Sequence, residues 1–502
     1  YQARLPLPLK VSRDYGEYAA SYKLEGQTLV GQRTLRLRQS ELPAERLQDY
    51  QAFVAAVRSD AAQTLSLETE IAGAPALPAT VKTQDLLDAS EAAVRNRNYP
   101  VAEQLLKRVV EKEPKHKTVR RNLGFVLVQQ RKFDEAIEVL REQTKINPFE
   151  DYAYNLLGRI YWQKQDYQNA EESFRKQIEV TPLDQTAHSS LGQMLVEWRK
   201  YKEAVPELER ALSLEPESEV LHVTIGRAYL GLGETQKAIE SFEQAIKISR
   251  TPYVLNNVAY YLAFHKAQLD KAQQYAETAV ATMATSLRSL EAGNLTIEDL
   301  RNVASLAAYW DTLGWVYFQK GDLDNAEKYI TASWRIQQHS EVGHHVGAIA
   351  EKRGKKDEAI RFYAQGAVAD HIRPEARESL LTLVKADAVD SLLQTAKTEV
   401  AAYNVLTLAQ LMPDLKAPVE AEFYLLFGPD STRNAQVVDV KFIKGEESLK
   451  SIASQLKSIK YPLVFPDASP TKIVRRGTLR CAPKPGACTF TMVSPDMIVS
   501  VD

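Results

Sequence analysis

The clearest candidates for chemistry in this 502-residue chain are its only two cysteines, Cys481 and Cys488. They stand in the sequence Cys-Ala-Pro-Lys-Pro-Gly-Ala-Cys, and no further ligands lie nearby to complete a zinc site. The pair can form a disulfide that closes a hairpin loop, worth about 2–3 kcal/mol by chain entropy. Alternatively, both are free thiols of a cytosolic protein. Flanking strands would hold the sulfurs close together, which favours the disulfide and with it an oxidising compartment.

Other reactive residues are not arranged for catalysis. His344 and His345 are adjacent, and adjacent residues of a helix do not share a face, so we expect surface or inter-helix histidines and not a metal site. The chain contains no Gly-x-Ser-x-Gly elbow and no phosphate-binding loop. We therefore expect no catalytic residue, no metal and no cofactor.

Charge and hydropathy argue against two further classes of protein, nucleic-acid binders and membrane-spanning proteins. The net charge is −2, from 63 basic and 65 acidic residues, whereas a general nucleic-acid binder is normally basic. No stretch approaches the roughly 18 uncharged apolar residues of a membrane span. Neither a nucleic acid nor a direct membrane span is expected.

The elements that must position any binding residue follow a 34-residue period. Prolines recur at Pro114, Pro148, Pro182 and Pro216, glycines at Gly124, Gly158, Gly192 and Gly226, and alanines at Ala102, Ala136, Ala170, Ala204 and Ala238. Such a period predicts paired antiparallel helices stacked in a solenoid, in which the small residues allow close helix contact and proline ends the second helix.

The repeat resembles the tetratricopeptide repeat. Its pattern of large and small residues is clearest in Tyr154-Leu157-Gly158-Tyr161-Ala170-Phe174-Pro182 and in Trp310-Leu313-Gly314-Tyr317-Ala326. The resemblance implies a right-handed helical solenoid of eight units over 83–385, starting near 83, 117, 151, 185, 219, 252, 307 and 340. The sixth unit departs from it, because Ala259 replaces the glycine and an insertion follows near 285–303. That insertion is either a partner-binding element or a solvated loop.

A solenoid of this kind usually binds other molecules. Its first helices line a concave surface whose exposed residues select the ligand. Amides there can bond to the backbone of an extended peptide while aromatic rings cover its side chains. The residues predicted to face this groove are Asn155, Arg159, Trp162, Arg227, Asn256, Asn257, Tyr260, Asp311, Trp315 and Phe318. The alternative is that several of them pack between neighbouring repeats, Trp315 and Tyr260 among them.

The amino-terminal residues 1–71 have strand-like patterns in place of the helical repeat, and they indicate the end of a larger β-rich domain. A strand over Leu5–Leu9, a hairpin over Tyr15–Leu24 and Thr28–Leu37, a helix over Leu42–Arg58 and a strand over Thr64–Glu70 are predicted. Residues 72–82 read as a linker.

This amino-terminal part resembles the β-domain that follows the papain-like core of bacterial transglutaminase-like envelope proteins. The matching residues are Leu5-Pro6-Leu7-Pro8-Leu9-Lys10-Val11-Ser12-Arg13-Asp14-Tyr15-Gly16-Glu17-Tyr18, Leu24-Glu25-Gly26 and Arg36-Leu37-Arg38. The resemblance implies an exported parent protein. The core that bears the family's Cys, His and Asp is absent from this chain, so no catalytic residue can be transferred.

Beyond the repeats, residues 386–419 predict a capping helix and a linker, and 420–502 a small α/β domain. Strands are expected at 422–427, 437–443, 473–480, 489–493 and 497–501, with a helix over 447–459. This domain is weakly similar to TonB-like terminal domains, on Gly445-Glu446-Glu447-Ser448-Leu449, Tyr461-Pro462 and Phe465-Pro466.

The sequence thus predicts a mainly α protein, a tetratricopeptide solenoid flanked by a β-rich segment and a small α/β domain. Three functions fit it. The first is a non-catalytic scaffold in the bacterial cell envelope, periplasmic or secreted, that binds a protein or peptide in its groove. The second is the substrate-positioning half of a transglutaminase-like enzyme, and the third is a structural subunit of a larger assembly or homo-oligomer.

Overall fold

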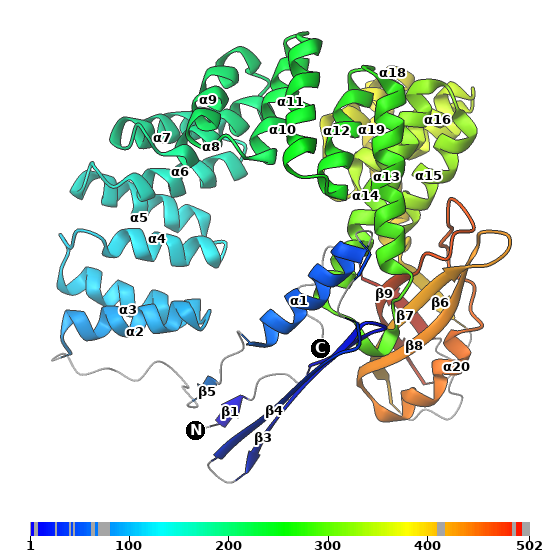
Figure 1. Cartoon of the computed structure of the whole chain (residues 1–502), viewed down its shortest axis with the longest axis horizontal. Coiled ribbons are helices and arrows are strands. Elements are labelled where there is room, and N and C mark those ends of the chain that lie inside the picture. Colours follow the sequence, from blue (N-terminus) through cyan, green and yellow to red (C-terminus); the bar gives the residue numbers. More distant parts are fainter. Residues whose placement is uncertain are drawn as a thin grey trace. The chain divides into compact units, whose positions relative to one another are not determined.

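The chain is mainly helical, with short sheets near both ends (Figure 1). A computed structural model describes residues 2–4, 9–25, 28–39, 42–43, 46–61, 66–68, 81–408, 417–483 and 488–493. These residues form two compact units, one of Tyr1–Leu5 with Thr64–Arg250 and one of Pro6–Gln63 with Thr251–Asp502. The division at residue 250 falls inside the predicted repeat region.

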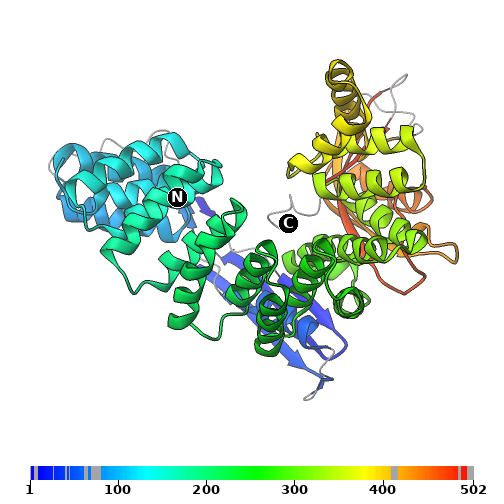
Figure 2. The same cartoon turned by 90° about the horizontal axis from the view of Figure 1, so that it is seen from above.

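The first unit contains five helix pairs in series, visible from a second direction in Figure 2. They are α2 (Thr83–Arg95) and α3 (Tyr99–Lys112), α4 (Val119–Gln129) and α5 (Phe133–Ile146), α6 (Asp151–Gln163) and α7 (Tyr167–Val180), α8 (Gln185–Glu197) and α9 (Tyr201–Leu214), and α10 (Glu219–Gly231) and α11 (Thr235–Ile248). Two short strands, β1 (Gln2–Arg4) and β5 (Ser66–Glu68), pair antiparallel in the same unit. The pairs begin close to the positions that the 34-residue period predicts.

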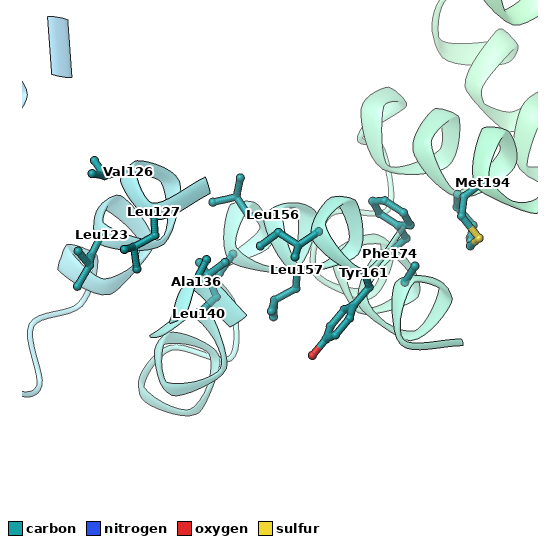
Figure 3. Packing of buried hydrophobic residues seen from close by; sticks show 14 of the residues in the cluster. Leu123, Val126, Leu127, Ala136, Leu140, Leu156, Leu157, Tyr161, Phe174 and Met194 are labelled. Atoms are coloured by element: carbon teal, nitrogen blue, oxygen red, sulfur yellow. The ribbon is translucent and has the colours of Figure 1, made fainter. Parts of the chain in front are cut away.

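Four of the five pairs, all except α2 with α3, are closed by a large side chain set against a glycine. A methyl group at Gly158 would lie 2.6 Å from Cε1 of Phe174, and the equivalent distance from Gly124 to Cδ2 of Leu140 is 2.5 Å. Figure 3 shows the buried leucines and aromatic rings that fill the space between these helices. The periodic glycines are therefore explained by contact between the helices and not by backbone conformation.

The second unit continues with helices and begins with a sheet. Its helices are α1 (Leu47–Ala61), α12 (Pro252–Phe264), α13 (Leu269–Leu287), α14 (Ile297–Lys320), α15 (Leu323–Ile336), α16 (Ser340–Lys352), α17 (Lys356–Gly366), α18 (Pro374–Leu383) and α19 (Ala386–Ala402). The amino-terminal sheet has the order β2-β3-β4, with β2 (Leu9–Arg13), β3 (Gly16–Glu25) and β4 (Thr28–Leu37). The predicted hairpin is confirmed as β3 and β4. The helix predicted after the hairpin is α1, and the capping helix predicted after the repeats is α19.

The insertion near 285–303 is not a solvated loop. It lengthens α13 and α14 and adds a short 3-10 helix, η2 (Ala292–Asn294). Leu290 and Ala292 are buried there. Backbone carbonyls of the insertion accept hydrogen bonds from the carboxy-terminal domain, where Lys472 Nζ lies 2.8 Å from the oxygen of Leu290.

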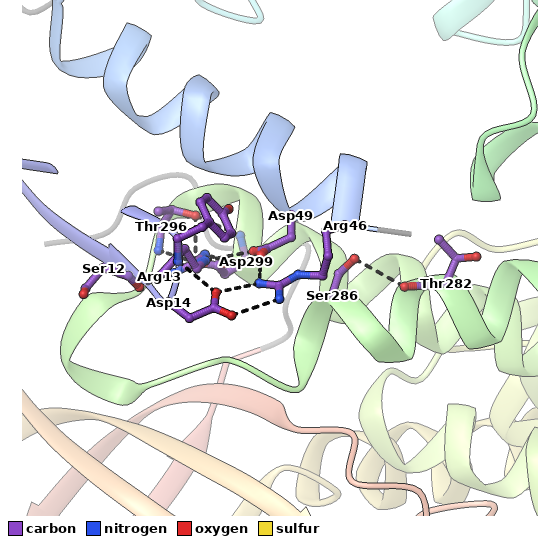
Figure 4. Close-up of polar contacts among 10 residues, drawn as sticks. Ser12, Arg13, Asp14, Arg46, Asp49, Thr282, Ser286, Thr296 and Asp299 are labelled. Atoms are coloured by element: carbon purple, nitrogen blue, oxygen red, sulfur yellow. Dashed lines mark hydrogen bonds and ion pairs between the residues drawn. The ribbon is translucent and has the colours of Figure 1, made fainter. Parts of the chain in front are cut away.

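Arg13 of β2 joins the amino-terminal sheet to the insertion. Its Nε donates to Asp49 of α1 at 2.8 Å, and its Nη2 donates to Asp299 of α14 at 3.1 Å (Figure 4). Asp299 also completes the capping box with Thr296 that starts α14. All three charged side chains are at most 5% exposed, so the insertion buries a charge network that fixes β2 and α1 against α14.

The carboxy-terminal domain is an antiparallel five-stranded sheet of order β6-β10-β9-β7-β8. Its elements are β6 (Val405–Leu408), β7 (Val419–Pro429), β8 (Ala435–Gly445), η3 (Glu447–Ile452), α20 (Ala453–Leu456), β9 (Ile473–Cys481) and β10 (Cys488–Met492). The sequence predicted four of these strands and missed β6, which is only four residues long. The predicted strands over Leu5–Leu9 and 497–501 and the linker over 72–82 lie wholly or largely outside the described residues.

The two cysteines face each other across β9 and β10. They are a register pair with Cα atoms 4.0 Å apart, and their sulfurs are bonded. The disulfide therefore links the two ends of the loop that joins these strands.

Candidate peptide-binding groove

The first helices of three successive repeats in the first unit line one concavity of about 430 Å³. Its two main walls are related by the repeat itself, because Phe125 and Val128 of α4 stand 34 residues before Arg159 and Trp162 of α6. The residues that line it are Phe125, Val128, Gln129, Tyr152, Leu156, Arg159, Ile160, Trp162, Gln163, Gln165 and Glu197. The period that builds the fold thus places the same helix face of each repeat toward one space.

One wall of this groove is aromatic. The Trp162 indole donates from Nε1 to Glu197 Oε2 of α8 at 2.9 Å, and its ring meets Phe174 edge-on with centroids 6.4 Å apart. Tyr152 begins the same helix and is 41% exposed. These contacts hold the indole in place while one side of it remains accessible, as a rigid surface for an apolar side chain requires.

Arg159 supplies a positive charge in the middle of the groove. Its side chain is exposed, and it forms no hydrogen bond or ion pair with any residue that the structure describes. The lining carboxylate, Glu197, is engaged by Trp162 and by the hydroxyl of Tyr167 at 3.2 Å. The guanidinium therefore has its donors available for a ligand beside an apolar wall.

The other two predicted residues of the first unit do not line this concavity. Asn155 is 6% exposed, and its Nδ2 donates to Gln177 Oε1 of α7 at 3.1 Å. The interpretation of Asn155 as a groove residue is corrected, because its position on α6 faces the second helix of the same pair. Arg227 lies half-buried on α10 and is not among the lining residues.

In the second unit, two predicted groove residues are buried in a charged stack. Asp311 is 6% exposed and accepts from His345 Nδ1 at 2.9 and 3.0 Å. The Trp315 ring stacks on His345 with centroids 3.9 Å apart, and on Phe318 at 4.7 Å. Asp311 and Trp315 therefore pack between α14 and α16, which corrects their interpretation as exposed groove residues. Phe318 is the half-buried end of this stack.

The protonation state of this stack is set by its partners. Burial opposes a charge on His345, but the carboxylates of Asp311 and Glu341 together outweigh it and raise the pKa of His345 above its ordinary value of 6.5. For the adjacent His344, burial and the neighbouring charge lower the pKa to about 4. The partners of His345 thus favour its charged form, whereas His344 is neutral at neutral pH.

The remaining predicted residues lie on α12, and two of them, Asn257 and Tyr260, form hydrogen bonds within the protein. Asn256 is 9% exposed, which corrects the expectation that it faces the groove. Asn257 Nδ2 donates to the carbonyl of Tyr253 at 2.9 Å, one helical turn earlier. The Tyr260 hydroxyl donates to Glu341 of α16, so this ring bridges two first helices.

Most residues that line the groove were not among the predicted ones. Phe125, Val128, Tyr152 and Glu197 were not singled out, although the period contains the signal for three of them. Stepping 34 residues back from Arg159 and Trp162 reaches Phe125 and Val128, and stepping forward from Gln163 reaches Glu197.

Two further properties concern the described part of the chain. No three or more His, Cys, Asp or Glu side chains within it are placed to hold a metal ion together. No helix within it is long and apolar enough to cross a membrane.

Comparisons with known proteins identify tetratricopeptide repeats in this chain. One family model described as tetratricopeptide repeat matches residues 93–160 and 195–259, and a second matches 151–182 and 307–338. Tetratricopeptide repeats are thereby confirmed in both units, within these matched residues. The matches lie between residues 93 and 338, and the resemblances stated for the two ends of the chain stay predictions.

Solved structures with similar segments include two named proteins. A crystal structure of MamA is 21% identical, covers 34% of this chain and 92% of its own, and has a TM-score of 0.32. YrrB, described as a TPR protein with an unusual peptide-binding site, is 18% identical, covers 35% and 91%, and has a TM-score of 0.32. No curated protein matches the sequence.

Proposed function

We propose that this protein is a non-catalytic scaffold that binds an extended peptide segment of a partner protein in the groove formed by α4, α6 and α8. The segment places an apolar side chain against the wall of Phe125, Val128 and Trp162. A carboxylate or backbone carbonyl of the same segment accepts hydrogen bonds from Arg159.

The observation that supports this function most strongly is the exposed Arg159 next to an aromatic side chain that is already fixed. A pre-positioned indole costs little conformational entropy when a ligand arrives, and an uncompensated guanidinium offers up to five donors. Buried tryptophan and arginine side chains dominate many peptide and protein interfaces.

Selection of a binding peptide tests the proposal. Random 12-residue peptides displayed on phage are selected on the full chain, and the enriched peptide is labelled for fluorescence anisotropy. We expect Trp162→Ala to weaken its binding about 30-fold, since a central aromatic contact is worth about 2 kcal/mol. Arg159→Ala is expected to weaken binding about fivefold, through loss of one charge-assisted contact of about 1 kcal/mol.

The matched control is Arg210→Ala. Arg210 is an exposed arginine of α9 in the same unit and does not line the groove. Its removal is expected to leave the dissociation constant unchanged. Equal binding by all three variants would assign the peptide to another surface and reject this function.

The proposal includes an oxidising compartment, the periplasm or the exterior of a bacterial cell. Its support is the pairing of Cys481 with Cys488 across β9 and β10, because such bonds persist in exported proteins and are rare in the cytosol. Mass spectrometry of protein alkylated under denaturing, non-reducing conditions tests this point. Two alkylated thiols in protein isolated from its own cells would contradict it.

A further inference from the structure

The first two junctions between second helices in the first unit have an arginine at one equivalent position, and the third junction has a glutamate there. Arg141 of α5 lies over the ring of Tyr161, with its guanidinium carbon 5.7 Å from the ring centroid. Thirty-four residues later the same position holds Arg175, and after another 34 it holds Glu209. The pair Arg141–Tyr161 thus recurs as Glu209–Tyr229, with the sign of the charge inverted.

At the second junction, between α7 and α9, the chain's own arginine fills the space. Arg175 contacts Glu171 at 2.7 Å and Glu207 at 3.6 Å. Glu207 also accepts from His188 Nδ1 at 2.7 Å, and His188 is only 7% exposed. Glu207 thus contacts both the arginine and the histidine.

The third junction, between α9 and α11, has the equivalent histidine but lacks the arginine and the glutamate. His222 Nε2 lies 3.1 Å from the carbonyl of Pro216, as His188 Nε2 lies 3.1 Å from that of Pro182. Ser241 stands where the preceding junction has Glu207, and Nδ1 of His222 has no partner among the described residues. The result is an open concavity of about 530 Å³.

The lining of this concavity is acidic around an apolar floor. Leu212 and Ile225 supply the floor, and Glu209 and Glu240 supply carboxylates. The Oε1 atom of Glu209 accepts a hydrogen bond from the Tyr229 hydroxyl at 2.9 Å. This bond positions the carboxylate at the side of the concavity, and its second oxygen can accept from a ligand.

One cationic side chain, Lys237, also lines the concavity. Its ammonium lies 2.6 Å from Glu234 and 5.3 Å from the centre of the Tyr229 ring. Lys237 also interacts electrostatically with Glu209 and Glu240. One cation therefore faces three carboxylates, and the concavity keeps a net negative charge.

We propose that the concavity between α9, α10 and α11 binds an arginine side chain of a partner protein beside Glu209, the residue that replaces Arg175 of the preceding junction. The guanidinium bonds to Glu209 and Glu240, and its methylene stem packs on Leu212 and Ile225. This site is separate from the groove of α4, α6 and α8 and does not depend on the function proposed for that groove.

Methyl NMR tests the site directly. The probe is the peptide acetyl-Gly-Arg-Gly-amide, titrated into full-length protein labelled at isoleucine and leucine methyl groups. We expect a saturable shift of the Ile225 δ1 methyl resonance. The citrulline peptide, which is neutral and nearly isosteric, is expected to bind about fivefold more weakly, as the loss of a partly exposed charge pair predicts.

Two variants decide between this site and non-specific attraction. Glu209→Gln is expected to reduce the affinity for the arginine peptide to that for the citrulline peptide. The double variant Glu209→Arg/Ser241→Glu introduces the arginine and one of the two glutamates of the preceding junction and is expected to abolish the shift.

A groove variant, Arg159→Ala, is expected to leave the response of Ile225 unchanged, which keeps this test independent of the groove. No saturable shift with the wild type, or equal affinity for the arginine and citrulline peptides, would overturn the proposal.

Discussion

The buried pair of Asp311 and His345 makes a specific prediction for the pH dependence of stability. Replacing Asp311 by asparagine removes the negative charge 2.9 Å from His345 Nδ1 and leaves a histidine that is 3% exposed. Near pH 6 the variant is expected to lose about 3 kcal/mol of unfolding free energy, at the lower end of the cost of breaking a buried ion pair.

The sign of the pH dependence follows from the pKa of His345. Because the folded-state pKa is raised above 6.5, the stabilisation is fully present below pH 6.5 and is lost as the pH rises through the folded-state pKa. Above that pKa His345 is neutral, and its ring N–H keeps one hydrogen bond to the charged carboxylate, worth about 1.5 kcal/mol. The difference between wild type and Asp311→Asn is therefore expected to shrink from pH 6 to pH 9.

Neighbouring charges do not reverse this expectation. Glu341 favours the charged form of His345, and Arg373 opposes it, but both are unchanged in the variant. His344 is neutral over this pH range, since its pKa is lowered to about 4.

Urea unfolding followed by tryptophan fluorescence at pH 6, 7.5 and 9 provides the measurement. Trp315 stacks on His345 and reports on this part of the second unit. The control is Asp270→Asn, which removes an exposed carboxylate 2.6 Å from Lys320. It is expected to show no change of pH dependence between pH 6 and 9. A wild-type-minus-Asp311→Asn difference that stays constant over this range would refute a charged His345.

Three further changes test the packing. Gly158→Ala is expected to cost about 1–3 kcal/mol in thermal unfolding because the new methyl has no room, whereas Gly293→Ala, which meets open space, should change little. Arg13→Met leaves Asp299 buried without its cation and is expected to cost about 3 kcal/mol; amide hydrogen exchange that stays slow throughout α1 would contradict this anchoring. Cys481→Ser opens the loop between β9 and β10 and is expected to lower unfolding free energy by about 2 kcal/mol, and equal melting of wild type and variant would show that the bond contributes nothing.

The repeat architecture could be predicted because its signals are local and recur. Gly158 and Phe174 lie 16 residues apart and are in contact within one helix pair. The residues that determine how two helices pack therefore lie within a single 34-residue unit. The hairpin of β3 and β4 was equally accessible, since its alternation and its turn lie within one short segment.

The candidate site was harder to predict, because the sequence does not show which polar residues find partners inside the protein. Asn155 and Arg159 both lie on α6, yet Asn155 turns inward to Gln177 and Arg159 stays exposed. Asp311 finds His345 from the next first helix, 34 residues away. The docking of Arg13 on Asp299 spans 286 positions and leaves no sequence signal at all.

The central claim is that a peptide segment binds between α4 and α6. A crystal structure of the full chain with the phage-selected peptide tests it most directly. We expect the peptide to lie in the concavity, with an apolar side chain on Trp162 and an oxygen atom within hydrogen-bonding distance of Arg159. A peptide bound anywhere else on the chain, with this groove left open, would contradict the claim.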